Sequence, residues 1–294
     1  ETITAAFVEA DLYASNKFVT RLGARAEHNS LTEKLYLDPR ISLAYKTDAD
    51  GQVSFAYGTF RQSPKNDFVR MDHSLAQEKA EHFILNYQRI ENDKTFRIET
   101  YYKLYDDLIK VENGTTLTNT GSGYARGVEL FWRDKQSIDK LDYWISYSFL
   151  DTERDYLNFP EKAVPIFASK HNLSIVGKYF VQNLKSQLGA TYSISSGRPY
   201  HNPNDEKFNS GKTPSYQDLS FNWSYLPKPH LIIYFSCTNV LGRDNIFGYE
   251  YSATLNENGQ YNSRAIRQPA PRFLFLGIFI TLSKDKTTNQ LMTL

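Results

Sequence analysis

Residues 94–105 read KTFRIETYYKLY, and this stretch decides the fold class. Every second position holds a mostly apolar side chain, at Phe96, Ile98, Thr100, Tyr102 and Leu104. The positions between them hold Arg97, Glu99, Tyr101 and Lys103. A strand places alternate side chains on opposite faces, whereas a helix would scatter both sets around its circumference. The stretch therefore predicts a strand with one apolar and one polar face.

The same alternation recurs along the whole chain, for example at 18–26, 141–149 and 218–225. We predict thirteen strands, at 3–14, 17–28, 35–47, 51–62, 79–90, 94–108, 123–134, 141–152, 169–181, 185–196, 215–226, 230–241 and 271–282. A tilted strand that crosses a bilayer needs about 9–11 residues, and these strands are that long or longer. The fold class predicted is all-β, in the form of an antiparallel transmembrane β-barrel.

Composition excludes several other classes. The 34 Lys and Arg nearly balance the 33 Asp and Glu, which argues against a nucleic-acid partner. Mean hydropathy is −0.53, and the longest strongly apolar run, 273–280, is too short for a membrane-spanning helix. The single cysteine, Cys237, excludes an intrachain disulfide and a cysteine-based zinc site. The first ten residues, ETITAAFVEA, lack the pattern of a signal peptide.

The predicted connections alternate between short turns and long polar loops. Short turns fall near 15–16, 48–51, 91–93, 135–140, 182–184 and 227–229, and longer loops at 63–78, 109–122, 153–168, 197–214 and 242–270. Outer-membrane barrels have short periplasmic turns and long extracellular loops. With an odd number of strands the chain would start outside and end inside, which suggests the C-terminal part of a longer barrel.

The polar strand faces fit either the lumen of a barrel or the solvent side of a soluble sandwich. In a barrel the lumen-lining candidates are Arg21, Arg25, Glu27, Arg97, Glu99, Lys103, Glu129 and Arg133. Aromatic residues near the short-turn ends, namely Tyr13, Tyr45, Trp132 and Tyr225, suit an interfacial girdle. The last strand, 271–282, is apolar on both faces.

Several motifs occur in an order that resembles a known family. They are AFVEA at 6–10 leading to RLGARAE at 21–27, PRISLAY at 39–45 before FAYGTFRQSP at 55–64, NTG at 119–121 with GVEL at 127–130, TNVLG at 238–242, and PRF at 271–273. Together they resemble the C-terminal barrel portion of TonB-dependent outer-membrane receptors, especially the Bacteroidota-like type with a carboxypeptidase-regulatory-like domain.

The resemblance implies a barrel segment at 1–283 and a C-terminal extension at 284–294, which departs from the family's usual terminal aromatic. Family barrels have 22 strands, so 22 − 13 leaves nine strands, the plug and the TonB box outside this chain. The implied function is TonB-dependent uptake of a scarce ligand across the outer membrane of a Gram-negative bacterium. Implied partners are outer-membrane lipid, TonB through the plug, a siderophore, glycan or other small molecule, and a surface lipoprotein.

Other readings stay open at this point. A passive porin-like barrel is the main alternative, and a soluble or surface β-sandwich adhesin is the third. No enzymatic activity, cofactor or metal site is predicted, because the six histidines have no metal-ligand spacing and no catalytic motif is present. Aromatic and arginine side chains in the long loops are the ligand-binding candidates: Tyr156, Phe159, Arg198, Tyr200, His201, Tyr249, Tyr251, Tyr261, Arg264 and Arg267.

Overall fold

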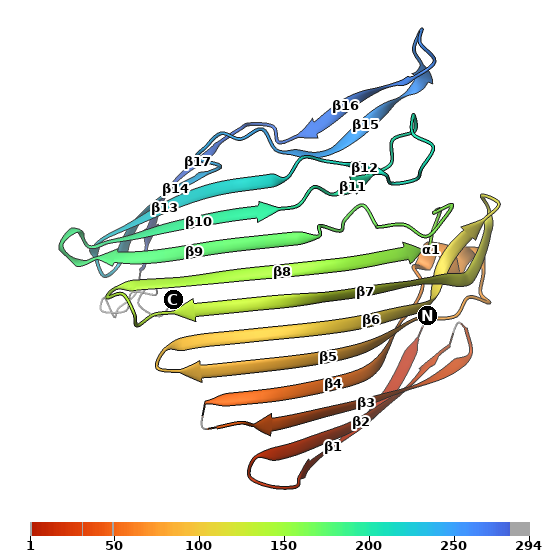
Figure 1. Ribbon diagram of the computed structural model, residues 1–294, viewed down its shortest axis with the longest axis horizontal. Coiled ribbons are helices and arrows are strands. Elements are labelled where there is room, and N and C mark those ends of the chain that lie inside the picture. The colour runs from red at the N-terminus through yellow and green to blue at the C-terminus, as the bar shows by residue number, and fades with distance from the viewer. Residues whose placement is uncertain (1, 31, 49, 283–294) are drawn as a thin grey trace.

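The computed structural model describes residues 2–30, 32–48 and 50–282. Within these residues the main feature is a 13-stranded sheet in the order β1-β2-β3-β4-β5-β6-β7-β8-β9-β10-β13-β14-β17, in which every neighbouring pair is antiparallel (Figure 1). The strands are β1 (Ile3–Tyr13), β2 (Phe18–Asn29), β3 (Lys34–Lys46), β4 (Gly51–Gln62), β5 (Glu78–Glu91), β6 (Lys94–Glu112), β7 (Thr116–Asp134), β8 (Leu141–Asp155), β9 (His171–Val181), β10 (Ser186–Ser195), β13 (Tyr216–Lys228), β14 (Leu231–Thr238) and β17 (Phe273–Ile280).

The predicted fold class is confirmed, and the thirteen predicted strands correspond one to one with the strands of this sheet. The register also confirms that each strand has two distinct faces. Arg21 lies opposite Ser42, Ser42 opposite Ala56, and Ala56 opposite Ile84. On the other face Leu22, Ile41, Tyr57 and Phe83 follow one another across the same strands.

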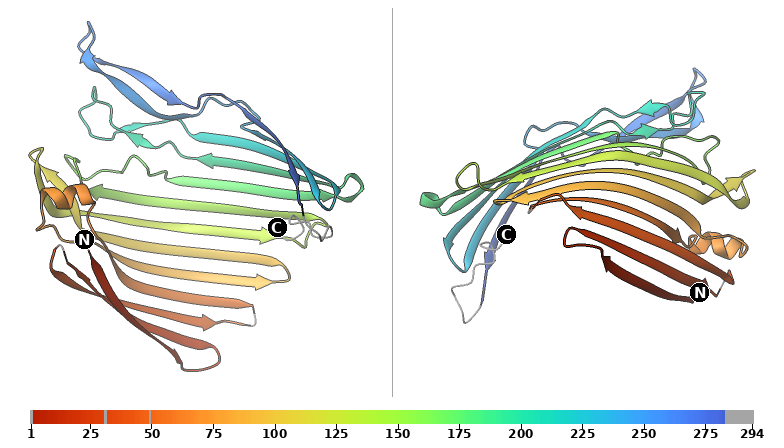
Figure 2. Two further views of the ribbon diagram at one scale, coloured as in Figure 1. Left: turned by 180° about the vertical axis from the view of Figure 1, so that it is seen from behind. Right: turned by 60° about the horizontal axis from the view of Figure 1, so that its bottom comes forward.

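The sheet is curved into an open arch, with β1 and β17 at its two edges (Figures 1 and 2). The polar strand faces line the concave side, where the Gln77 side chain of loop 63–78 donates to Glu27 Oε1 of the polar face at 2.9 Å. The apolar faces, which include Leu22 and Ile41, form the convex side. The sheet carries no second sheet packed on its convex face within the described ranges, so the sandwich interpretation is not supported. Large apolar side chains such as Val8, Leu37 and Leu276 are about two-thirds exposed there. An apolar surface of this extent indicates a face that something apolar covers.

Aromatic side chains gather on the convex face at the short-turn end. Phe96 lies between Tyr87 and Trp132, with ring centroids 6.2 and 6.4 Å apart, and Tyr45 and Tyr225 lie at the same end of their strands. Tyr13 lies on the concave face instead. It is opposite Val19, and this pair is two residues along the strands from the Asp11–Arg21 pair, which is on the concave face. The girdle prediction is therefore wrong for Tyr13.

The short turns are fixed by side chains that satisfy the backbone. Asp48 accepts hydrogen bonds from the backbone N–H groups of Asp50 and Gly51, at 3.0 and 2.6 Å. Asp134 accepts the same kind of bond from Gln136 and Ser137, at 2.8 and 2.9 Å. Aspartate at these positions favours a tight turn because its carboxylate replaces a backbone acceptor. These backbone bonds also hold the pKa of the Asp48 carboxyl below its ordinary value.

The long-loop end is more ordered than the sequence predicted. The expected loop 109–122 is instead the upper part of β6 and β7, which are 19 residues long each. Two further hairpins occupy the other loops: β11 (Pro199–Tyr200) with β12 (Gly211–Lys212), and β15 (Ile246–Leu255) with β16 (Tyr261–Arg267). A short helix, α1 (Asn66–Met71), lies in the loop after β4, and a 3-10 turn, η1 (Gln182–Leu184), joins β9 to β10.

The loop 63–78 folds back over the concave face and is anchored there (Figure 2). Leu75 is buried in a small apolar cluster with Ile109 and Leu117, against which Phe68 and Val111 pack. This cluster explains why β6 extends past its predicted end and β7 begins before its predicted start. The added residues, which include Ile109 and Leu117, pack against Leu75. The predicted loop 63–78 is therefore held in place at the long-loop end of the arch, and we call this segment the shelf.

Candidate ligand-binding surface

Aromatic side chains from two separate loops form a continuous row at the long-loop end, which we call the aromatic ridge. Tyr156 contacts Phe159 and Phe159 contacts Phe208, each with ring centroids 4.8 Å apart, and Phe208 lies 5.0 Å from His201. Tyr156 and Phe159 follow β8, whereas His201 and Phe208 lie between β11 and β12. Three of these residues were predicted from sequence. Phe208 was missed because only polar and charged residues surround it in the chain.

A second group, the tyrosine cluster, consists of Tyr200, Tyr249 and Tyr251. The rings of Tyr200 and Tyr249 are 4.6 Å apart. Burial raises the pKa of Tyr251 to about 12, and the neighbouring Tyr200 adds to this shift. Gly211 is opposite Tyr200 in the β11–β12 pair, and a Cβ at this position would lie 2.6 Å from the Tyr200 ring. The glycine therefore leaves the space that this ring occupies.

Hydrogen bonds connect the three loops that carry these aromatic residues. Asn204 donates to the carbonyl of Tyr261 at 3.0 Å and accepts from the Tyr261 N–H at 2.8 Å. Asn209 donates to the carbonyl of Val164 at 3.1 Å. Loop 197–214 is thus tied to the β15–β16 hairpin on one side and to loop 153–168 on the other. The sequence placed these residues on separate loops, and the structure brings them onto one surface.

The loop arginines predicted from sequence are not equally available to a ligand. Arg267 pairs with Asp244 at 2.9 Å, and Arg264 is exposed opposite Glu250 on the hairpin. The side chain of Arg198 is exposed, and its backbone N–H donates to Thr213 Oγ1 at 2.9 Å. None of the three contacts the aromatic ridge within the described residues.

Arg154, at the upper end of β8, is the arginine that does contact the aromatic ridge. Its guanidinium carbon lies 4.4 Å from the ring centre of Tyr105, 5.4 Å from Phe167 and 5.6 Å from Tyr156. Arg154 and Tyr105 were not predicted as site residues, because strand residues at the end of an alternating pattern give no sign of their three-dimensional neighbours.

The eight predicted lumen-lining residues all lie on the concave face. The register joins Arg21 on β2, through Ser42, Ala56 and Ile84, to Tyr101 on β6, and Tyr101 to Gly127 on β7. Arg97, Glu99, Lys103, Glu129 and Arg133 share the face of these residues. Four of these eight charged residues are ion-paired within the wall: Arg21 binds Asp11 at 2.7 Å, Arg25 binds Glu27 at 2.8 Å, and Arg133 binds Asp142 at 2.6 Å.

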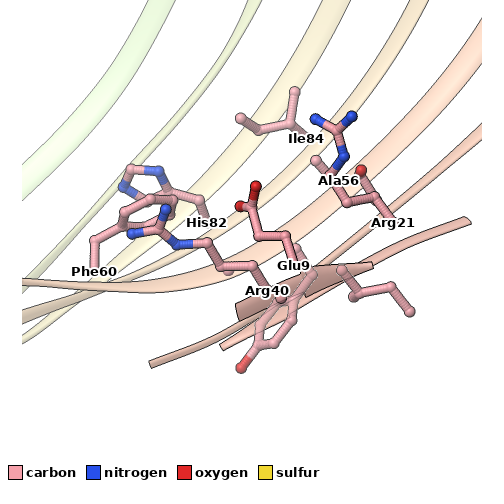
Figure 3. Close-up of a pocket in the computed structure, with 12 residues that line it drawn as sticks. Glu9, Arg21, Arg40, Ala56, Phe60, His82 and Ile84 are labelled. Atoms are coloured by element: carbon pink, nitrogen blue, oxygen red, sulfur yellow. The ribbon is translucent and has the colours of Figure 1, made fainter. Parts of the chain in front are cut away.

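A cavity of about 180 Å³ is hollowed into this concave wall over β1 to β5 (Figure 3). The guanidinium of Arg40 lies 4.7 Å from the Phe60 ring centre, and Phe60 lies 4.6 Å from His82. Glu9 and Arg21 border the cavity on the β1 side. The Nε atom of Arg40 is buried without a hydrogen-bond partner. The cavity is lined by charged side chains together with aromatic and aliphatic ones, and it was not predicted from the sequence.

Two further observations concern metals and helices. In the described part of the chain no group of three or more His, Cys, Asp or Glu side chains is placed to hold a metal ion. No helix among residues 2–30, 32–48 and 50–282 is long and apolar enough to span a membrane.

Comparison with known proteins identifies the architecture. Residues 1–240 match the family described as "TonB dependent receptor-like, beta-barrel". The fold is similar to that of the outer membrane transporter YddB from Escherichia coli, with a TM-score of 0.71, 12% identity, and coverage of 95% of this chain and 45% of that one. For the FrpB iron transporter from Neisseria meningitidis the TM-score is 0.71 and the identity 13%, and the match covers 95% of this chain and 44% of that one. For the siderophore receptor PiuA from Acinetobacter baumannii the TM-score is 0.70 and the identity 14%, and the match covers 94% of this chain and 43% of that one.

The chain thus spans less than half the length of these solved receptors. At such low identity the structural likeness shows the fold alone. The comparison with curated proteins gives no match.

Proposed function

The chain belongs to the TonB dependent receptor-like β-barrel family, and from this premise we propose that it forms part of the wall of a receptor that imports a scarce ligand with energy supplied by TonB. The family consists of outer-membrane transport receptors and not of enzymes. The observation that carries the proposal is the family match over residues 1–240, together with a curved wall that is polar inside and apolar outside. TonB would act through the plug domain of such a receptor.

The ligand we propose is a ferric complex of a small organic chelator. Support comes from the names of the solved structures with this fold, which include iron transporters and a siderophore receptor, and from the aromatic ridge and tyrosine cluster at the long-loop end. Aromatic faces suit stacking on planar ligand groups. The eight charged residues of the concave wall would line the path of the ligand.

A glycan is the second candidate, because the motifs at 6–10, 21–27 and 39–64 resemble the Bacteroidota-like receptors with a carboxypeptidase-regulatory-like domain. In that case a surface lipoprotein would be a partner. Aromatic rings also stack on sugar faces, so the ridge is compatible with either ligand.

Uptake measurements test the proposal directly. The native reading frame that contains this chain is expressed in a Gram-negative host without its own ferric-complex receptors, and radioactive iron uptake is measured with and without TonB. We expect uptake that requires TonB. Uptake of similar size without TonB would favour the passive porin-like alternative, and ion conductance of the purified protein in planar bilayers would support that result.

A further inference from the structure

Arg154 differs from most arginines of the wall in having no carboxylate partner. Among the described residues, ion pairs to Asp or Glu are made by Arg21, Arg25, Arg61, Arg89, Arg126, Arg133 and Arg267. Arg154 instead lies against three aromatic rings, and its Nε atom is buried without a hydrogen-bond partner. A guanidinium that is partly removed from water and left without an acceptor has unused binding capacity.

The carboxylates next to Arg154 are committed elsewhere or point away. Asp155 receives two hydrogen bonds from Lys110, the longer at 2.7 Å. Glu153 pairs with Tyr124 in the register, on the convex side of β8. Alternation puts Arg154 on the concave side, opposite Gly123. The positive charge of Arg154 is therefore not neutralised by either adjacent residue.

The position of Arg154 is fixed by its surroundings. The backbone N–H of Arg154 donates to the carbonyl of Ala163 at 2.9 Å, and the backbone N–H of Ala163 donates to the carbonyl of Arg154 at 3.0 Å. A Cβ on Gly123 would lie 2.9 Å from Arg154 Cγ, so the glycine makes room for the side chain. Aromatic rings hold the guanidinium plane by cation–π contacts. A guanidinium held in this way is preorganised for two parallel hydrogen bonds to an oxyanion.

We propose that Arg154 binds an anionic oxygen group of the imported ligand, a carboxylate, catecholate or phosphate, while planar parts of the ligand stack along Tyr156 and Phe159. The inference rests on the proposed function, since it names the ligand class that the aromatic ridge receives. It also shifts anion recognition away from Arg267, which is already paired with Asp244. An anionic chelate is favoured over a neutral glycan by this site.

Arginine footprinting tests the site without any substitution. The full-length receptor in detergent is treated with phenylglyoxal, which modifies free guanidinium groups, and each arginine is followed by mass spectrometry. The probes are citrate, the anionic ferric tris(catecholate) complex and the cationic complex ferrioxamine B. We expect one or both anionic probes to slow modification of Arg154, in proportion to occupancy, and ferrioxamine B to leave it unchanged. Equal rates of Arg154 modification with and without both anionic probes would overturn the proposal.

Substitutions give a second measurement. Arg154→Gln should weaken binding of the protecting anionic probe by about tenfold or more, the effect of losing a charge-assisted hydrogen bond, and Arg154→Lys should recover only part of it. The matched control is Arg126→Gln, which removes a guanidinium from the convex face at the same end of the sheet. Unchanged affinity in Arg154→Gln, or an equal loss in Arg126→Gln, would contradict a specific site. Protection of Arg154 in a receptor without TonB-dependent uptake would refute the proposed function and leave the anion site standing.

Discussion

At the scale of single residues, the tyrosine cluster gives a titration that reports on loop structure. Burial raises the pKa of Tyr251 to about 12, above the value of about 10 for a free tyrosine. The folded state therefore binds the proton more tightly, so this stabilisation of the loops is complete below pH 10 and is lost as the pH rises towards 12. Phenolate absorbance should show that Tyr251→Phe lacks one of the late-titrating tyrosines of the parent protein.

Gly211 offers a way to disturb this tyrosine without touching it. In Gly211→Ala the new methyl group meets the Tyr200 ring, and because the ring is the free end of a side chain we expect it to swing away from Tyr249 and Tyr251. The late titration should then move towards pH 10, with little change in overall stability. Gly248→Ala is the control, since a Cβ there would lie at an ordinary 3.6 Å from Ile266. Identical titrations in both variants would show that Tyr200 does not influence Tyr251.

Sequence could identify candidate aromatic residues, such as Tyr156 and Tyr249, but not how they assemble. Their residue type and loop position are visible in one dimension, whereas the contacts through Asn204 and Asn209 depend on where other loops fold. Which arginines form ion pairs with carboxylates could not be predicted from the sequence either. Asp244 lies far from Arg267 in the chain, so nothing local indicated that Arg267 is neutralised and Arg154 is not.

At the scale of elements, alternation predicted the strands well because a barrel wall has two chemically distinct faces. It failed where another surface intervenes. Leu108 and Ile109 break the alternation of β6, since register shifts fall around Leu108 and the loop 63–78 covers this region. The β15–β16 hairpin was missed although Asn258-Gly259 is a strong turn signal between two alternating segments.

The shelf formed by loop 63–78 should depend on Leu75. Leu75→Ala removes the side chain that packs on Ile109 and Leu117, a change that costs about 2–5 kcal/mol at a buried site. We expect the loop to open locally while the sheet stays folded. Trypsin should then cleave after Lys65 or Arg70 much faster than in the parent protein.

The control for this experiment is Leu184→Ala, at a side chain that is 64% exposed in the η1 turn. It should leave cleavage in loop 63–78 unchanged. Unchanged trypsin cleavage in Leu75→Ala would mean that other contacts hold the shelf, foremost the bonds between Asn119 and the backbone of Ala76 and Asp107.

The three tryptophans test which face of the wall meets lipid. Trp132 and Trp223 lie on the convex face, whereas Trp144 pairs with Arg133 on the concave face. In the intact receptor, single-tryptophan variants should show quenching of Trp132 and Trp223 by lipids whose acyl chains are brominated close to the head group. Trp144, which lies beside the charged groups of Arg133 and Lys178, should be protected. Equal quenching of all three would contradict the assignment of the faces.

At the scale of the whole molecule, the arch cannot close on itself in the manner of its relatives. The described sheet has 13 strands and every neighbouring pair is antiparallel, so the first and the thirteenth, β1 and β17, run in the same direction. Direct contact between these edges would require a parallel pair, whereas bacterial single-chain barrels normally have an even number of antiparallel strands. The sheet also overlays on only part of each larger receptor.

Cysteine cross-linking of the isolated 294-residue chain in detergent tests this arrangement. With Cys237 replaced by serine, the pair Val8→Cys and Leu276→Cys places one thiol on the convex face of each edge strand. The pair Ala6→Cys and Ala26→Cys is the positive control, because these residues are opposite each other in β1 and β2. We expect an intrachain disulfide in the control alone, since unpaired edges do not meet. Comparable yields would show that the chain closes as a small barrel by itself, and passive diffusion would then explain its function better than powered import.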